Sequence, residues 1–199
     1  YNPVAQTGAP IPLETYLAYG TGTDGGTIAE TDVVGDSNAK TGVYAFDGYD
    51  DVARVANFID TAYNSMSSTT IESGFANYAT LRKVVHFARL HGNDYAAVKA
   101  ERDAWAINSN YSRAYADGLG LIVPNSDDVN DTTYLPSLGD VIGVAAYSAQ
   151  NFKPWLSYAG QNRGVIINNL GVGNSWGADQ ATLNLLAQSQ INVVVRENS

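Results

Sequence analysis

The stretch KPWLSYAGQNRG, residues 153–164, decides how the C-terminal half of this chain folds. Pro154 restricts one φ angle, Trp155 carries a large apolar ring, and Gly160 and Gly164 permit backbone conformations that are closed to other residues. The stretch separates a helical apolar pattern from a strand-like apolar run. It therefore predicts a structured corner, and we expect the Trp155 ring to be substantially buried there.

Arg163 is the polar side chain of this corner that stands out. Its planar guanidinium can bind a carboxylate or backbone carbonyl groups through two parallel hydrogen bonds. Beside Gly164 it either holds the corner together internally or crosses a boundary between subunits. The sequence leaves both alternatives open.

The pattern around the corner alternates between strands and helices. Gly118 to Val123 predicts a strand ended by Pro124, a polar loop follows at 126–133, and Ser137 is expected to cap the next helix. After the corner we expect four elements: a strand at 165–168, a loop broken by Gly171, Gly173 and Gly177, a helix at 178–190, and a strand at 191–196.

The middle of the chain predicts three helices. Apolar residues spaced by three and four predict the first at 50–63 and the second at 75–91, with Leu81 on the buried stripe of the second and Gly92 as its stop. The third is expected at 94–106. A serine and threonine cluster at 65–70 breaks the first pattern, and the run GVYAF at 42–46 predicts a short strand.

These elements indicate one α/β or α+β domain at 43–199, in which about five helices flank a sheet in a sandwich-like arrangement. Residues 1–42 are rich in Gly and Thr and predict an irregular segment with short strands at most. A chain of 199 residues that is 45% hydrophobic is long enough to bury a core.

Composition excludes several classes of function. The chain has 11 basic and 20 acidic side chains and a formal charge of −9, which disfavours binding to nucleic acid or to anionic membrane surfaces. It has no cysteine, so thiol chemistry, disulfides and cysteine-ligated metals are excluded. Its apolar runs are shorter than the roughly 18 residues of a membrane span.

Three patterns could carry chemistry, and each has a simpler interpretation. Residues 20–25 match the G-x-G-x-x-G spacing of dinucleotide sites, but no buried strand precedes them and no helical pattern follows, so we interpret them as a surface turn. His86 and His91 are expected as a surface pair on one helix, and the acidic run at 127–131 as a solvated turn that could bind a cation opportunistically. We predict no catalytic site, cofactor or metal.

The corner and its surroundings resemble the contractile-tail sheath proteins of myovirus-type bacteriophages. The order of motifs agrees over about 65 residues: Leu135-Pro136-Ser137, a helix, Lys153-Pro154-Trp155, Ala159-Gly160, Arg163-Gly164, an apolar strand, a helix, and a strand that opens with Ile191-Asn192. Thr23-Asp24-Gly25 also resembles a turn of that family, with one of the family's glycines missing.

The resemblance implies a structural subunit and no enzyme. Such subunits polymerise around a tail tube, contact the baseplate, and contract to drive DNA injection; they are assembled in the host cytoplasm and reside in the virion. The resemblance also implies linkage between copies by strand addition near the chain termini, so that Pro154, Trp155, Gly160, Arg163, Gly164, Ile191 and Asn192 become candidates for structural or assembly roles. We expect the chain to be a fragment that lacks the complete C-terminal linking region and is monomeric alone.

Two other functions remain open from the residues themselves. A hydrolase with a carboxylate acid and base would need a pair of carboxylates facing across a cleft, and no such pair stands out. A carbohydrate- or surface-binding module is suggested by 13 tyrosines and 3 tryptophans, since aromatic rings can stack on sugar rings. An exposed aromatic platform would favour the binding module.

Overall fold

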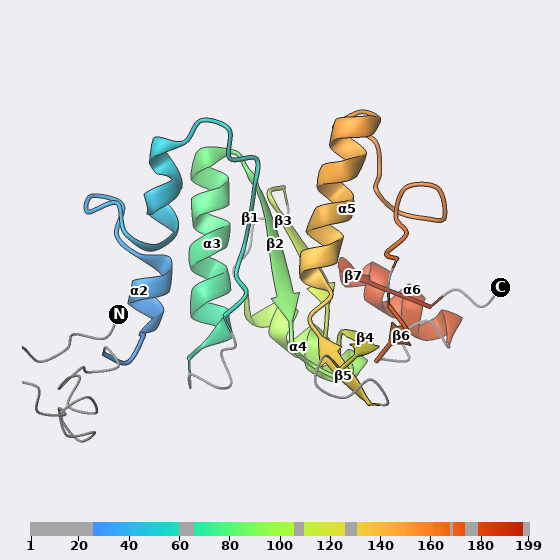
Figure 1. Ribbon diagram of the computed structural model, residues 1–199. Coiled ribbons are helices and arrows are strands. Elements are labelled where there is room, and N and C mark those ends of the chain that lie inside the picture. Colours follow the sequence, from blue (N-terminus) through green and yellow to red (C-terminus); the bar gives the residue numbers. More distant parts are fainter. Residues whose placement is uncertain are drawn as a thin grey trace, which may run out of the picture.

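The computed structural model describes residues 26–59, 66–105, 110–125, 131–167, 169–173 and 179–196 (Figure 1). The helices in these ranges are α2 (Glu30–Val34), the 3-10 helix η1 (Gly42–Gly48), α3 (Ser68–Arg82), α4 (Tyr95–Ala104), α5 (Leu138–Asn151) and α6 (Gln180–Gln188). The strands are β1 (Arg54–Ala56), β2 (Val85–Leu90), β3 (Ser112–Ala116), β4 (Leu121–Pro124), β5 (Thr132–Leu135), β6 (Gly171–Val172) and β7 (Ile191–Val193).

The main sheet has four parallel strands in the order β1-β2-β3-β7. Parallel neighbours need a crossover connection, and α3 and α4 supply the crossovers from β1 to β2 and from β2 to β3. Val55 lies opposite His86, which in turn lies opposite Ser112, and Ala114 lies opposite Ile191. The expected fold class, a sheet flanked by helices, is confirmed.

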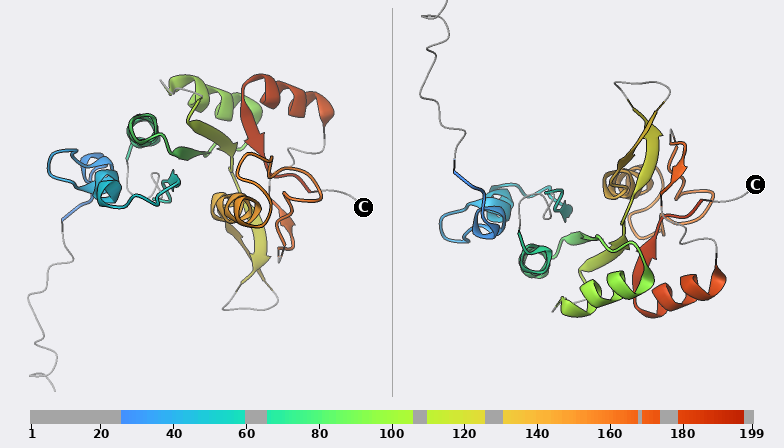
Figure 2. Two further views of the ribbon diagram at one scale, coloured as in Figure 1. Left: turned by 90° about the horizontal axis from the view of Figure 1, so that it is seen from above. Right: turned by 90° about the horizontal axis from the view of Figure 1, so that it is seen from below.

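Helices cover both faces of this sheet (Figure 2). Alternate side chains of β2 point to opposite faces: Ala88 packs with Val98 of α4 and Leu186 of α6, whereas Phe87 packs with Leu138 of α5. A further core cluster joins α3 to η1 and β1. Because β2 and β3 are covered on both faces, most of their side chains are buried, including the polar His86 and Ser112.

A second, smaller sheet was not predicted. Its three strands are antiparallel in the order β5-β4-β6. The turn before β4 depends on Gly120, which has φ +71° and lies so close to β5 that a Cβ atom would come within 2.1 Å of the Leu135 carbonyl oxygen. Only glycine fits that position without movement of the backbone.

The start of α5 is fixed by a buried carboxylate. The Ser137 N–H and hydroxyl both donate to Asp117 Oδ1, at 2.8 and 2.5 Å, and Arg89 Nε lies 3.1 Å from Asp117 Oδ2. Ser137 occupies the N-cap position, as expected, but its side chain makes no capping bond. Its hydroxyl instead ties the helix to the end of β3.

Several predicted elements are confirmed with shifted ends. The helix expected at 94–106 is α4, capped by Asp94, and the helix expected at 178–190 is α6. The strand expected at 191–196 is β7, which ends at Val193, and the strand expected at 118–123 is β4, which begins at Leu121. Within the described residues, no helix is long and apolar enough to cross a membrane.

The helix predicted at 50–63 is wrong over its described part. Residues 54–56 form β1, and Val55 is buried between β2 and the core of α3. The short run VARVA fits either a helix or a buried strand, because a run this short cannot separate the two periods. Pairing with β2, which lies 31 positions further along the chain, selects the strand.

The helix predicted at 75–91 merges two elements. α3 begins earlier, with Ser67 Oγ accepting from the Thr70 N–H at 3.3 Å, so the serine and threonine cluster starts the helix. It ends at Arg82, followed by Lys83 in the left-handed conformation with φ +57°. Residues 85–90 form β2, because hydrogen bonds to β1 and β3 outweigh the local helical spacing.

Two short strand predictions are also wrong. Residues 42–46 belong to η1, and residues 165–167 have no regular structure. The loop predicted at 126–133 extends into β5, which begins at Thr132. Among the described residues, 42–46 and 165–167 pair with no strand, whereas residues 132–135 pair with β4. The local sequence does not reveal whether such a partner exists.

Two alanine substitutions on α3 test which of its side chains are buried. Ile71 is fully buried, whereas Leu81 is 68% exposed although the helical pattern predicted it to be buried. We expect Ile71→Ala to lower the free energy of unfolding by about 2–5 kcal/mol and Leu81→Ala to change it by less than ~0.5 kcal/mol. Urea denaturation of both variants measures this, and equal losses would contradict the exposure of Leu81.

Candidate functional site

The predicted corner follows α5 and projects from the body of the protein (Figure 1). The expectation that Trp155 is buried is wrong: its side chain is 78% exposed, and Pro154 is also exposed. The Lys153 ammonium lies 5.8 Å from the centre of the Trp155 ring. α5 ends at Asn151, and none of the described elements passes over the residues that follow, so the ring is left in solvent.

Hydrogen bonds within the corner hold its shape. Gly160 has φ +78°, and its carbonyl oxygen accepts from the N–H groups of Arg163 and Gly164 at 3.3 and 2.8 Å. Arg163 Nε donates to the Ser157 carbonyl oxygen at 2.8 Å. The sequence left open whether Arg163 binds within the corner or across a boundary between subunits, and this hydrogen bond lies within the corner.

Tyr158 anchors the corner to the core. Its hydroxyl lies 3.1 Å from the Tyr115 hydroxyl, and its ring centre lies 6.1 Å from that of Phe87. Burial, together with the hydrogen bond to Tyr158, raises the pKa of Tyr115 above its ordinary range, so the Tyr115 hydroxyl remains protonated at neutral pH. One aromatic residue of the corner therefore packs inward while Trp155 faces outward.

β7 forms one edge of the main sheet. Ile191 is buried in the core, and Asn192 is held on the β3 side by its Nδ2 group, which donates to the Ala114 carbonyl oxygen at 3.1 Å. Among the described residues, β7 pairs with β3 alone, so its other edge is open. An open edge presents unpaired backbone groups to which another strand can add.

Asp179 fixes the helix that leads into β7. Its carboxylate caps α6 by accepting from the N–H groups of Ala181 and Thr182 at 3.0 and 3.1 Å. The hydrogen bond from the Thr182 hydroxyl and these two backbone bonds lower the pKa of Asp179. The carboxylate is thus ionised, and the cap is made, at neutral pH.

A groove of about 900 Å³ lies between β7 and the corner. Its walls include Tyr115, Val141, Tyr158, Val165 and Val194, and it continues along the backbone to Arg196. Large apolar side chains near the groove and on the corner are exposed to solvent: Tyr147, Phe152, Trp155, Leu156, Ile167 and Leu170. Clustered exposed apolar residues commonly mark surfaces that bind other proteins.

A buried polar network lies elsewhere, at the amino-terminal ends of β2 and β3, and the sequence did not reveal it. His86 Nε2 lies 2.8 Å from Glu72 Oε2, and His86 Nδ1 lies 3.2 Å from Ser112 Oγ. His86 and Glu72 are fully buried, so the prediction of an exposed histidine pair on one helix is wrong. Only the β2–β3 register brings Ser112 to His86, which is why spacing gave no signal.

The network contains a carboxylate, an imidazole and a hydroxyl, as a serine hydrolase does, but its placement differs. Ser112 lines a cavity of about 480 Å³, but neither Glu72 nor His86 lines that cavity or the groove. We interpret it as a structural link between α3, β2 and β3.

Other candidate chemistry falls partly outside the described residues. The G-x-G-x-x-G match at 20–25 and residues 127–130 of the acidic run lie outside them. Within the described residues, no group of three or more His, Asp or Glu side chains could hold a metal ion. The open edge of β7, the groove and the corner thus form the candidate functional site, which we call the corner surface.

A pair of glycine substitutions tests the shape of the corner. A Cβ atom on Gly164 would lie 2.6 Å from the Tyr158 carbonyl oxygen, whereas Gly143, exposed on α5, has open space around it. We expect Gly164→Ala to destabilise the fold by about 1–3 kcal/mol and Gly143→Ala to stabilise it by roughly 0.5–1 kcal/mol. Chemical denaturation decides between this result and a tolerated Gly164→Ala, which would mean that the corner is loosely packed.

Comparison with known proteins gives one informative similarity. No protein-family model matches the chain. Over 68 residues, or 33% of its length, the chain is 41% identical to the tail sheath protein of Vibrio phage KVP40, and this stretch covers 10% of the phage protein. Part of the chain is therefore similar to a small part of a phage tail sheath protein.

Proposed function

We propose that this chain is a structural domain of a contractile phage tail sheath. In this role it polymerises with other copies around the tail tube, contacts the baseplate, and takes part in the contraction that drives DNA injection. It resides in the tail of the virion after assembly in the host cytoplasm. The observation that carries the proposal is the 68-residue similarity to a tail sheath protein.

The corner surface supports this role because it has what a subunit of a polymer needs. A neighbour that covers exposed apolar side chains such as Trp155 and Ile167 removes them from water. Their burial contributes favourable free energy to association. The open edge of β7 can accept a strand through main-chain hydrogen bonds. In the proposal, Pro154, Gly160, Arg163 and Gly164 hold the shape of this surface.

In the proposed role, Ile191 and Asn192 position β7 through different contacts. Ile191 anchors β7 in the core, and Asn192 bonds to β3, so both keep the strand in register while its outer edge stays available. The linking segments themselves would come from neighbouring copies. A structural role of this kind requires no catalytic residue.

A surface- or carbohydrate-binding module is the second candidate, and the exposed aromatic residues favour it. Trp155, Tyr147 and Phe152 lie near the end of α5, and the rings of Tyr147 and Phe152 are 6.4 Å apart in an edge-to-face arrangement. Such rings can stack on sugars as well as on a protein neighbour. Binding of the chain to bacterial surface polysaccharide, lost in Trp155→Ala, would favour this candidate over the sheath.

Substitution of Trp155 separates assembly from folding. Because the ring is 78% exposed, we expect Trp155→Ala to change the free energy of unfolding by less than ~1 kcal/mol and to weaken polymerisation of the longer sheath protein. Leu81→Ala, which removes an exposed apolar side chain away from the corner, is the matched control and should polymerise normally. Urea denaturation and electron microscopy give the two readouts. Normal polymers of Trp155→Ala would exclude this ring from the assembly contacts.

The assembly state of the chain itself gives a direct test of the proposal. Strand addition needs partner segments as well as an open edge, so we expect this chain to be monomeric in dilute solution. A longer chain with the native sequence on both sides should form rings, tubes or helical polymers, measurable by light scattering. A stable hexamer of the present chain would mean that its own faces carry the ring contacts. A longer chain that never polymerises, with or without tail tube, would contradict the sheath role.

A further inference from the structure

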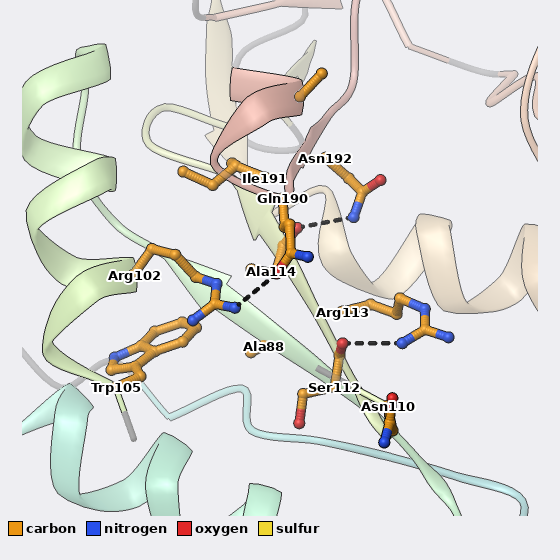
Figure 3. Close-up of a pocket in the computed structure, with 11 residues that line it drawn as sticks. Ala88, Arg102, Trp105, Asn110, Ser112, Arg113, Ala114, Gln190, Ile191 and Asn192 are labelled. Carbon is orange, nitrogen blue, oxygen red and sulfur yellow. Dashed lines mark hydrogen bonds between the residues drawn. The ribbon is translucent and has the colours of Figure 1, made fainter. Parts of the chain in front are cut away.

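A second cavity borders the groove of the corner surface, with which it shares the lining residues Arg113 and Asn192. It measures about 480 Å³ and opens beside the carboxyl ends of α4 and α6 and the amino ends of β3 and β7 (Figure 3). Ala88, Trp105 and Ile191 form apolar parts of its wall. Its polar lining consists of guanidinium, amide and hydroxyl groups, from Arg102, Asn110, Ser112, Arg113, Gln190 and Asn192. None of the lining residues is acidic, although the whole chain has a formal net charge of −9.

Arg102 and Arg113 give this cavity positive charge, and Arg102 holds it in a form that can bind a ligand. Its Nη2 group donates to Gln190 Oε1 at 3.3 Å, a neutral acceptor. Among the described residues no carboxylate lies within ion-pair distance of Arg102, and its neighbour Asp103 pairs with Lys99. Arg82 and Arg89 differ in this respect, since each lies next to an aspartate.

The donors in the cavity suit a carboxylate. A guanidinium has five N–H donors, and one hydrogen bond to Gln190 leaves most of them for a ligand. A concave site with an indole in its wall excludes part of the water, so that an ion pair is stronger there than on a flat surface. α4 and α6 end at this cavity, and the partial negative charge of their last carbonyls offsets part of the positive charge. The site therefore suits a singly charged carboxylate better than a doubly charged phosphate.

We infer that this cavity binds a carboxylate side chain of a second copy of this chain. Each copy carries nine more acidic than basic side chains, 20 against 11, so its neighbours present carboxylates in excess. An acid-free, arginine-lined cavity on such a protein is complementary in charge to another copy of itself. The inference rests on the proposed sheath role for the self-association of the chain, and it adds a polar contact beside the corner surface.

Nuclear magnetic resonance of the 15N-labelled chain tests the inference, with Arg102 Nε–H and Trp105 Nε1–H as reporters. We expect both signals to shift as protein concentration rises from micromolar to millimolar at low salt. Sodium acetate should shift the same signals and suppress the concentration dependence, whereas sodium chloride at equal ionic strength should shift them far less. Arg102→Gln should abolish the acetate response at Trp105 Nε1–H while leaving amide signals elsewhere unchanged, which shows that it folds. Lys83→Gln, which removes an exposed positive charge on another surface, should respond as the unmodified chain does.

Any one of several results would overturn the inference. An acetate response that survives in Arg102→Gln, or is matched by chloride, would show that the cavity has no carboxylate site. An acetate response without any dependence on protein concentration would show that the carboxylate does not come from a second copy. Failure of the longer chain to polymerise would contradict the sheath role but leave the acetate response intact, and normal polymers with no cavity response would contradict this inference alone.

Discussion

The buried carboxylate of Asp117 is the constraint on which the C-terminal half of the structure depends. It ends β3 and accepts two hydrogen bonds from Ser137, while Arg89 of β2 approaches its other oxygen. Its own N–H donates to the Leu90 carbonyl oxygen at 2.9 Å. A carboxylate that is 1% exposed is costly unless it is paired in this way. These partners leave few alternative positions for the start of α5, and α5 in turn carries the corner.

A second set of buried polar contacts also links helices to the strands of the main sheet. Glu72, His86 and Ser112 join a helix to two strands with fully or nearly fully buried groups. Arg54 of β1 also donates to the Ala145 carbonyl oxygen of α5 at 3.2 Å, across the sheet edge. Since a buried polar group loses much of its stabilisation when a partner shifts, such contacts favour one arrangement of helices over others. In the proposed sheath role, this rigidity would help the domain to present a defined surface to its neighbours.

The corner combines a fixed base with an exposed tip. Tyr158 holds its base against the core, Gly164 packs against the Tyr158 and Ala159 backbone within the corner, and Trp155 projects into solvent. An exposed tryptophan contributes little to the stability of an isolated domain. Its burial by a neighbour would contribute about 1.5–3 kcal/mol or more to association. This arrangement fits the partial similarity to a phage tail sheath protein. The acid-free cavity beside α4 lies apart from the corner and would give a neighbour a polar rather than an apolar contact.

The sequence by itself determined the charge of the protein, the absence of cysteine chemistry, the fold class, and the elements with strong local signals. Asp94 and Asp179 cap α4 and α6, and glycines shape the corner, because capping and backbone freedom act within a few residues. Tertiary structure alone decided that Arg54–Ala56 and Val85–Leu90 are strands, since parallel pairing joins segments far apart in the chain. It likewise decided that His86 is buried and Trp155 exposed: a side chain's exposure depends on which distant elements pack over it, and local spacing does not encode that.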